Sequence, residues 1–417
     1  MEIRSISGKP ALPSGAWLIV VLLSVGGCLN YLDRIVITTM RASIIEAIPM
    51  TEAQFGLLTS SFLWTYGILS PFAGYLADKF NRSRVICLSV FVWSAVTWMT
   101  AYTTTFSELL ATRILMGVSE ACFIPAALAL IADYHRNRTR SLATGILMVG
   151  IMTGSGFGFA GGWVAEKYYW NTIFVYLGVF GIAYTIFLFF TLKDLRSDTG
   201  EAGEAAAPKE KVNFREAITS LFRLRSYIFI LIAWGLLGVV AWLVVGWLPT
   251  YFLEKFRLSE GMAGLYATAY FYAVALAGLL LGGYWSDRWS RTNPKGRLLV
   301  PIIGIMMGAP CIFMSSYLNV LPLVVICFMV YALSKSFIDT NMMPILCLVV
   351  NRQYRATAYG ILNFLACIIG GIGIYAGGAL RDMQVNMDLI FRFAAVTMVI
   401  ALVLLLMVKI KAEGPLE

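Results

Sequence analysis

Residues 74–84 read GYLADKFNRSR, and residues 283–297 read GYWSDRWSRTNPKGR. Both stretches are basic, both follow a long apolar run, and both place an aspartate four residues after a glycine. A second pair of segments repeats in the same order, because RSLATGIL at 140–147 returns as RATAYGIL at 355–362. These ordered repeats predict a chain built from two similar halves.

Composition indicates the solvent in which the chain folds. Apolar residues make up 59% of its 417 residues and charged residues 13%, about half the charged fraction of a soluble domain. One aqueous core could not bury so much apolar side chain, so lipid is the expected solvent. The apolar runs are continuous, as in 18–29, 173–192 and 393–408, which predicts membrane helices rather than the alternating strands of a barrel.

We therefore expect an all-α membrane protein with twelve transmembrane helices in two pseudo-symmetric six-helix bundles, since about 20–25 residues span a bilayer. The N-terminal bundle would occupy 1–192, a polar cytoplasmic linker 193–225, and the C-terminal bundle 226–417. The linker is predicted to carry a short surface helix around 214–222. The predicted spans are 16–39, 54–77, 84–103, 107–133, 140–165, 171–192, 226–252, 261–285, 297–318, 321–349, 356–380 and 388–409.

The basic residues predict the orientation. Most of the 32 Lys and Arg residues fall in the two termini, the linker and the loops on the same side. By the positive-inside tendency this side is cytoplasmic, here in a bacterial inner membrane. The same topology explains the net charge of +9 without a nucleic-acid partner. The seven cysteines lie in apolar segments and there is one histidine, so we expect no metal and no cofactor, in a chain that acts as a monomer.

The stretch GYLADKFNRSR resembles the signature loop of the major facilitator superfamily, G-x-x-x-D-x-x-x-R-[KR]. The matching positions here are Gly74, Asp78 and Arg82, with Asp287 and Arg288 in the second copy. This resemblance implies the major facilitator fold over the whole chain. It also implies that these residues form a gating loop at the cytoplasmic rim, rather than ligands for a substrate.

Three further stretches resemble the anion:cation symporter family: NYLDR at 30–34, RILMGVSEACFIP at 113–125 and GILNF at 360–364. This second resemblance implies proton-coupled symport of a small organic anion by alternating access, with a hexonate, a hexuronate or sialic acid as the substrate. Spinster-like carriers also begin their first helix with a similar N-Y-x-D-R pattern. A spinster-like lipid or drug exporter is therefore the alternative.

Within that resemblance, Asp33 and Glu120 correspond to the proton-coupling positions, while sodium stays open as another coupling ion. Arg34 and Arg113 correspond to the basic residues that hold the substrate carboxylate or couple it to protons. Asn363 corresponds to a substrate-contacting asparagine.

Ionisable residues inside the predicted spans support this assignment. Each would cost about 2.5–3.5 kcal/mol at the centre of a bilayer, so we expect them to face the protein interior and to be paired. Glu120 and Pro125 align with Asp339 and Pro344 in the second half, and Lys335 lies one helical turn before Asp339, where the two can pair. The six residues on which this assignment rests are Asp33, Arg34, Arg113, Glu120, Lys335 and Asp339.

The residues suggest a coupling mechanism. A substrate carboxylate that binds an arginine would displace the buried acid from that arginine, and the acid would then take up a proton. When the substrate leaves, the acid pairs with the arginine again and releases the proton. Fixed ion pairs that only hold helices together are the structural alternative. The substrate-binding candidates are Arg34, Arg113, Tyr66, Lys335, Asp339, Asn341 and Asn363.

Nothing in the sequence favours an enzyme. Patterns such as HExxH, GxSxG and the Walker motif are missing from the 417 residues, and these would mark the usual metal, nucleophile and nucleotide sites. A membrane sensor that transports nothing, or an unusual membrane enzyme, is the remaining alternative class.

Overall fold

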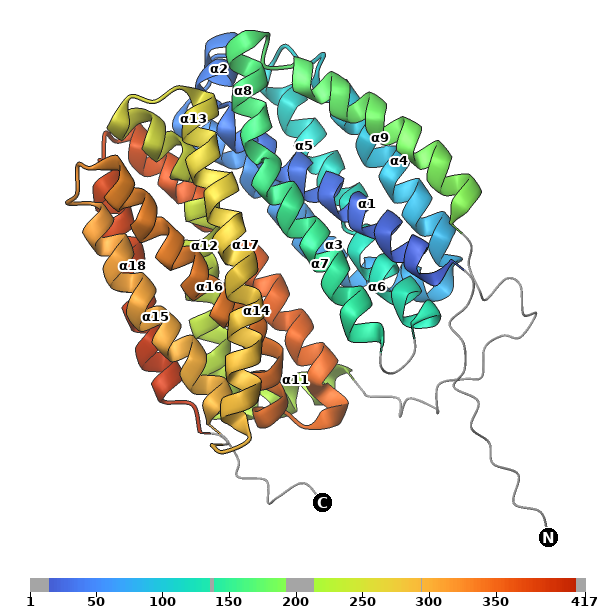
Figure 1. Ribbon diagram of the computed structural model, residues 1–417, viewed down its shortest axis with the longest axis vertical. Coiled ribbons are helices and arrows are strands. Elements are labelled where there is room, and N and C mark those ends of the chain that lie inside the picture. The colour runs from blue at the N-terminus through green and yellow to red at the C-terminus, as the bar shows by residue number, and fades with distance from the viewer. Residues whose placement is uncertain (1–14, 136–138, 193–213, 294, 410–417) are drawn as a thin grey trace.

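The computed structural model describes residues 15–135, 139–192, 214–293 and 295–409. Long helices run between two opposite faces of the molecule and form two side-by-side groups (Figure 1). We call the face at which residues 15 and 409 lie the terminal face. The two groups are the N-half, helices α1–α9, and the C-half, helices α11–α18.

The N-half is built from long helices, some of which are divided by a short break or a 3-10 segment. Its elements are α1 (Ala16–Val36), η1 (Ile37–Thr39), α2 (Arg41–Ala47), α3 (Glu52–Lys79), α4 (Arg82–Thr100), α5 (Phe106–Glu120), α6 (Phe123–Tyr134), α7 (Arg140–Gly156), η3 (Phe157–Phe159), α8 (Ala160–Lys167) and α9 (Thr172–Thr191).

The C-half repeats this arrangement after one short additional helix. Its elements are α11 (Phe214–Arg223), α12 (Arg225–Phe256), α13 (Glu260–Leu265), η4 (Tyr266–Tyr270), α14 (Phe271–Ser290), α15 (Gly296–Ser315), α16 (Leu321–Val349), η5 (Arg352–Tyr354), α17 (Arg355–Asp382) and α18 (Met387–Leu406). Helix α11 lies where a surface helix was predicted in the linker, and residues 193–213 of that linker lie outside the described residues.

The expected all-helical membrane fold is confirmed. One long helix differs from the others because it is less apolar. Within the described ranges, eleven helical segments are long and apolar enough to cross a membrane. The remaining long helix, α3, has 28 residues but carries polar side chains. Ser60 Oγ donates to the carbonyl of Gly371, at 2.7 Å, and Trp64 Nε1 donates to that of Ile368, at 3.0 Å. Helix α3 is less apolar because it faces α17 of the other half rather than lipid.

Helix ends and breaks follow local chemistry. Thr51 and Gln54 form a capping box at the start of α3, and Thr105 and Glu108 form another at the start of α5, which satisfies amide groups that a helix leaves free. One predicted span contains the five-residue π-helical turn η4. Such turns are frequently found at functional sites.

Small residues allow the helices of the N-half to approach closely. A Cβ atom at Gly150 would collide with the backbone of Ser24, and one at Gly154 with that of Cys28. Helices α1 and α7 therefore lie in backbone contact, as is usual where glycine lines a helix interface in membranes. This contact fixes the rotation of α1, and with it the direction in which the NYLDR segment points.

Candidate functional site

Arg34 and Glu120 form a buried ion pair in the N-half. Arg34 Nε lies 2.6 Å from Glu120 Oε2, and the side chains are 3% and 0% exposed. Arg34 lies in the last turn of α1 and Glu120 is the last residue of α5. The pair therefore joins two helices that are distant in sequence. Two buried opposite charges at this distance compensate each other's loss of hydration.

Three aromatic rings surround the guanidinium group of Arg34. Its Cζ atom lies 4.4 Å from the ring centroid of Tyr66, 4.5 Å from that of Tyr31 and 5.0 Å from that of Phe62. Such contacts attract a cation to the negative faces of the rings. Tyr31 and Tyr66 are half-buried, so the arginine is covered by two side chains that a ligand can reach. Tyr66 was predicted from the sequence, whereas Tyr31 and Phe62 were not.

Asp33 and Arg113 lie beside this pair but have other partners. Thr97 Oγ1 donates to Asp33 Oδ2 at 3.0 Å. Arg113 Nη2 donates weakly to Thr100 Oγ1 at 3.4 Å, and its Cζ atom lies 5.5 Å from the ring centroid of Phe174. Arg113 is only 1% exposed. Its guanidinium is therefore buried in the N-half, where its described contacts are with Thr100 and Phe174, and its role in substrate binding stays a prediction.

The C-half contributes a second charged pair, on α16. Lys335 Nζ and Asp339 Oδ2 are bonded within one helical turn, as their spacing predicted, and their side chains are 28% and 33% exposed. Tyr272 of α14 and Tyr359 of α17 lie within electrostatic range of both Asp339 and Tyr31. These tyrosines connect the two halves across the middle of the molecule. Tyr31 of α1 and Asp339 of α16 thus lie near the same two tyrosines.

The two asparagines expected to contact substrate differ in their surroundings. Asn341 is 1% exposed, and its Nδ2 donates to the carbonyl of Phe337 in the same helix, at 2.8 Å. One donor of its amide is therefore taken by its own helix and the side chain is buried, while its role in substrate binding stays a prediction. Asn363 is half-buried on α17, one turn from Tyr359, and stays a candidate.

The face opposite the termini is closed by charged residues from both halves, which we call the closed-face cluster: Arg41, Glu52, Glu254 and Arg381. Arg41 is bonded to Glu52 and lies 3.4 Å from Glu254. Arg381 Nη2 lies 2.6 Å from Glu254, and its Nε lies 3.4 Å from Glu52. Arg41 and Glu52 belong to the N-half, so the cluster ties the two halves together.

The positive charges of the two arginines in the cluster are balanced by its two carboxylates. Burial and the neighbouring guanidinium of Arg381 lower the pKa of Arg41 to about 10. Arg41 therefore remains a cation at neutral pH, and Glu52 and Glu254 hold the two arginines together against their repulsion. Asp382 adds a further link, because its carboxylate accepts from the amides of Glu52 and Ala53 at 2.8 and 2.9 Å.

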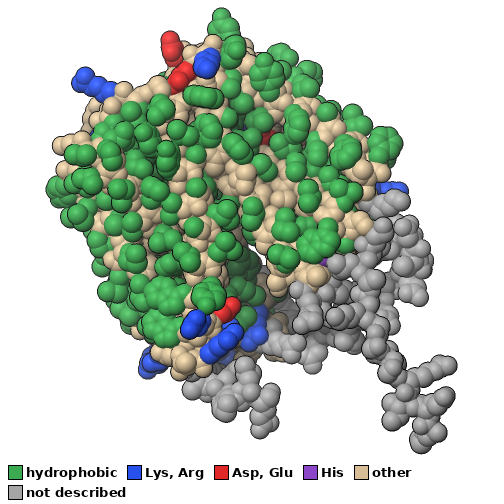
Figure 2. All heavy atoms as spheres, viewed as in Figure 1, with side chains coloured by type: hydrophobic (Ala, Val, Ile, Leu, Met, Phe, Trp, Pro, Cys, Tyr) green, Lys and Arg blue, Asp and Glu red, His purple; other side chains and the backbone are tan. Residues whose placement is uncertain are grey.

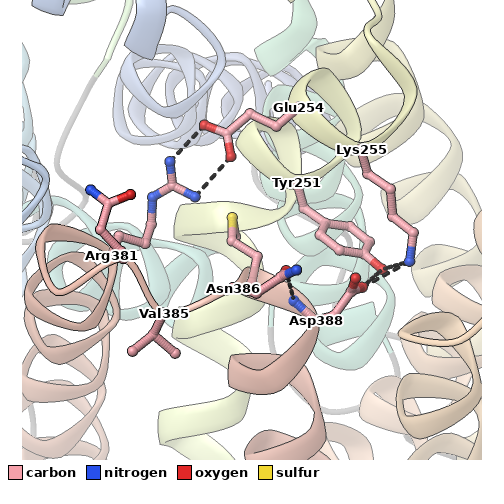
Figure 3. A pocket seen from close by; sticks show the side chains of 9 residues that line it. Tyr251, Glu254, Lys255, Arg381, Val385, Asn386 and Asp388 are labelled. Carbon is pink, nitrogen blue, oxygen red and sulfur yellow. Dashed lines mark hydrogen bonds and ion pairs between the residues drawn. The ribbon is translucent and has the colours of Figure 1, made fainter.

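A cavity of about 470 Å³ lies next to this cluster on the C-half. Figure 3 shows Arg381 directed at Glu254 on one side of it, and Lys255 and Tyr251 directed at Asp388 on the other. Lys255 Nζ lies 2.8 Å from both Tyr251 Oη and Asp388 Oδ1. The charged groups around the cavity are already paired with each other, so it adds no free charge to the closed face.

The two halves separate toward the terminal face. Near the closed face, a Cβ at Gly378 of α17 would meet the backbone of Glu52, and midway along α3 one at Gly67 would lie 2.7 Å from the Cβ of Cys367. Closer to the terminal face, a Cβ at Gly74 or at Gly360 would have no neighbour within 4 Å. Figure 2 shows a narrow hollow between the halves on that side. The arrangement is closed at one end and open at the other.

The predicted gating loops lie at this open end. Arg82 is 5% exposed, is bonded to Asp133 and donates to the carbonyl of Ala129 at 2.8 Å. In the second copy, Asp287 lies 3.4 Å from Arg297, and Arg288 donates to Tyr284 Oη at 3.1 Å. The side chain of Asp78 lies outside the described part of the chain. The bonds described here for Arg82, Asp287 and Arg288 are thus made within their own halves.

Comparison with known protein families shows the family to which this chain belongs. The profile of the Major Facilitator Superfamily matches residues 23–373 and 252–416. The chain belongs to this superfamily. It is therefore a multi-pass membrane protein of a transporter family rather than a member of an enzyme family, as the sequence predicted.

Relatives within the superfamily include spinster proteins, which the sequence favoured only as the alternative. Protein spinster homolog 1 of Xenopus tropicalis is 26% identical over 314 residues, covering 71% of this chain and 59% of the relative. The Sphingosine-1-phosphate transporter SPNS2 of Mus musculus is 26% identical over 385 residues, covering 87% of this chain and 69% of the relative. The chain thus spans less than two thirds of the first relative's length.

Solved structures give the same fold. A bacterial homologue of the human lysosomal transporter spinster, in an inward-facing and unoccupied conformation, superposes with a TM-score of 0.77 at 21% identity, covering 95% of this chain and 96% of the other. A point mutant of the nucleoside transporter NupG superposes with a TM-score of 0.74 at 15% identity, covering 93% of this chain and 99% of the other. These likenesses support the major facilitator fold of this chain.

Proposed function

We propose that this superfamily member is a proton-coupled secondary transporter of a membrane amphiphile with an anionic headgroup. The observation that carries the proposal is the buried Arg34–Glu120 pair, which is covered by Tyr31 and Tyr66 at the region between the two halves. The relative named as a sphingosine-1-phosphate transporter suggests a phosphate headgroup. This choice replaces the sugar acid favoured by the sequence with the alternative that the relatives support.

Charge balance explains why a proton would move with such a substrate. The four buried ionisable residues Asp33, Arg34, Arg113 and Glu120 have a net charge of zero when all are ionised. Arg34 Nη2 has no hydrogen-bond partner among the described residues, and guanidinium groups bind phosphate or carboxylate through two parallel bonds. An anion on Arg34 would compete with Glu120. Glu120 would then take up a proton, which keeps the buried charge near zero.

The surrounding wall suits a substrate with both polar and apolar parts. Tyr31, Tyr66 and Tyr359 combine an apolar ring with a hydroxyl tip, and such side chains can pack along an alkyl chain while bonding to a headgroup. Lys335 and Asp339 on the opposite half are partly exposed, so they could bond to a further headgroup polar atom. A zwitterionic or phosphate-bearing head would find complementary charge on both sides.

Transport in proteoliposomes tests this function. Vesicles that contain the purified protein would be given radiolabelled sphingosine-1-phosphate, or lysophosphatidate as a second phosphate amphiphile, under an imposed pH gradient. We expect accumulation that an uncoupler abolishes. The Glu120→Gln variant should retain exchange of labelled for unlabelled substrate while losing accumulation, because its side chain cannot carry a proton.

The same assay separates the competing substrate class. If a labelled hexonate accumulates and neither amphiphile does, the sugar-acid interpretation is correct and the lipid proposal is wrong. If the amphiphile accumulates equally with and without a pH gradient, but follows a sodium gradient, the coupling ion is sodium instead of the proton. We also infer that the open terminal face is cytoplasmic, as the basic termini predicted, and that the chain acts as a monomer.

A further inference from the structure

Thr268 lies in the π-helical turn η4, where the C-half meets the N-half, and its side chain is 2% exposed. Its Oγ1 lies 3.0 Å from the carbonyl oxygen of Gly156 in the N-half and 3.0 Å from that of Gly264 in its own half, and the two carbonyls share its hydrogen. The same oxygen accepts a hydrogen bond from the amide of Phe159 at 3.1 Å. One hydroxyl of the C-half is therefore bonded to two backbone groups of the N-half.

These two backbone groups belong to the break between α7 and α8. There the chain passes through the 3-10 segment η3, and the amide of Ala160 bonds to the carbonyls of Phe157 and Gly158. In an unbroken α-helix this amide would bond to the carbonyl of Gly156. Hydrogen bonds in 3-10 turns have poorer geometry, and a side chain that inserts into the helical ladder can hold a kink. The hydroxyl of Thr268 is placed to do this, because it joins the carbonyl at the start of the turn to the amide at its end.

The segments on either side of this contact lie in backbone contact across the two halves. A Cβ atom at Gly162 of α8 would lie 2.6 Å from the backbone of Glu260, and one at Gly264 would lie 3.1 Å from the Cα of Phe159. Figure 1 shows α8 and α13 toward the closed face. The bonds of Thr268 therefore require the arrangement in which this face is shut, and a separation of the halves there would remove them.

Thr39 offers a comparison within the N-half. It lies in η1 and is 2% exposed, its Oγ1 donates to the carbonyl of Gly158 at 2.9 Å, and it accepts from the amide of Gly162 at 3.2 Å. Thr39 thus bonds to the same break as Thr268. Because Thr39 belongs to the same half as the break, its bonds would persist when the halves separate.

We propose that Thr268 is a conformational contact: its hydroxyl stabilises the state with the closed face shut by bonding to the α7–α8 break, and these bonds are lost when the halves part at that face. Backbone polar groups within a membrane protein need partners, so losing them favours the shut state. The inference requires that the two halves move relative to each other, and it does not depend on the substrate or on the coupling ion.

Distance measurements between the halves test this contact. Spin labels at the exposed residues Tyr169 and Met383 in a cysteine-free background would report the share of molecules with the closed face open. In Thr268→Val, which keeps the shape but lacks the hydroxyl, we expect the ratio of open to shut molecules to rise about tenfold. Thr268→Ser keeps the hydroxyl and should resemble the wild type. Thr39→Val is the matched control, because it removes similar bonds from within one half, and it should leave the ratio unchanged.

Amide hydrogen exchange, resolved to single residues, provides a second measurement. The amide of Phe159 should exchange faster in Thr268→Val than in the wild type, since its bond to the hydroxyl is gone. In Thr39→Val the amide of Gly162 should exchange faster instead, while that of Phe159 keeps its protection. This pattern separates a contact between the halves from a general loss of stability.

The outcomes that contradict the inference are specific. It is overturned if Thr268→Val leaves the distance distribution unchanged, or if Thr39→Val shifts it equally. A shift in Thr268→Ser as large as that in Thr268→Val would also overturn it, because the hydroxyl would then not be the group responsible. Thr268→Ala, which lacks the hydroxyl and adds no bulk, takes the place of Thr268→Val if the latter does not give a monodisperse protein.

Discussion

Arg34 Nε lies 2.6 Å from Glu120 Oε2, although 86 residues separate the two along the chain. Removing one member of a buried ion pair leaves the other charge without compensation, which typically costs about 3–5 kcal/mol. We therefore expect Glu120→Ala to lower the melting temperature of the detergent-solubilised protein strongly. Glu120→Gln should lower it less, because the amide oxygen still accepts from Arg34, although the charge of Arg34 is uncompensated in this variant too. Equal losses for the two variants would mean that the charge of Glu120, and not its hydrogen bond to Arg34, accounts for the stabilisation, and no loss in either would mean that the pair contributes little.

The aromatic cover of Arg34 predicts that lysine cannot replace it. Lysine keeps the charge but lacks the planar fork that stacks on rings and binds phosphate through two bonds. For Arg34→Lys we expect amphiphile affinity to fall by about tenfold or more, as the loss of about 1.4 kcal/mol implies. Arg392→Lys is the matched control: Arg392 also stacks on a tyrosine, 4.0 Å from the ring centroid of Tyr317, far from this site. Affinity measured by ligand titration should be unchanged in that control.

The closed-face cluster predicts a shift in conformation rather than a loss of fold. Arg381→Ala removes the cation that bridges Glu254 and Glu52, so the closed face should open in a larger share of molecules. Spin labels at Tyr169 of the N-half and Met383 of the C-half, which are 82% and 74% exposed, would report the distance between the halves. We expect a longer distance population in Arg381→Ala, in a background with the seven cysteines replaced.

High salt should act in the same direction as Arg381→Ala, because salt screens partly exposed charges. Arg291→Ala, at the opposite face, is the control and should keep the wild-type distance distribution. A distribution that does not change in Arg381→Ala would show that the cluster is not what keeps this face closed.

Because α1 and α7 are in backbone contact, adding a methyl group should destabilise the protein at one glycine of α7 but not at another. At Gly154 a Cβ would collide with the backbone of Cys28, whereas at Gly145 in the same helix nothing lies within 4 Å. We expect Gly154→Ala to reduce the yield of monodisperse protein on size-exclusion chromatography and to lower its melting temperature. Gly145→Ala should behave like wild type. The opposite ranking would contradict the close approach of α1 and α7.

The central site was predictable only in part. The cost of charge in a bilayer indicated that Asp33, Arg34, Arg113 and Glu120 would turn inward, and the spacing of Lys335 and Asp339 indicated a direct pair. The structure contains that pair and places the other four side by side. Asn341 could not be judged in the same way, because helical spacing does not reveal that its amide is bonded to Phe337.

The closed-face cluster escaped sequence analysis altogether. Arg41, Glu52, Glu254 and Arg381 lie at or just beyond the ends of predicted spans, where a charged residue costs nothing and carries no signal.

The sequence by itself determined the membrane, the two halves and the residues that must avoid lipid, because hydropathy, repeats and the cost of buried charge depend on composition and order alone. Tertiary structure decided which partner each charge has. Whether Glu120 meets Arg34 or Arg113 depends on the rotation of α1, which is set by backbone contact at Gly150 and Gly154. Such contacts join residues far apart in the chain, and no local pattern encodes them.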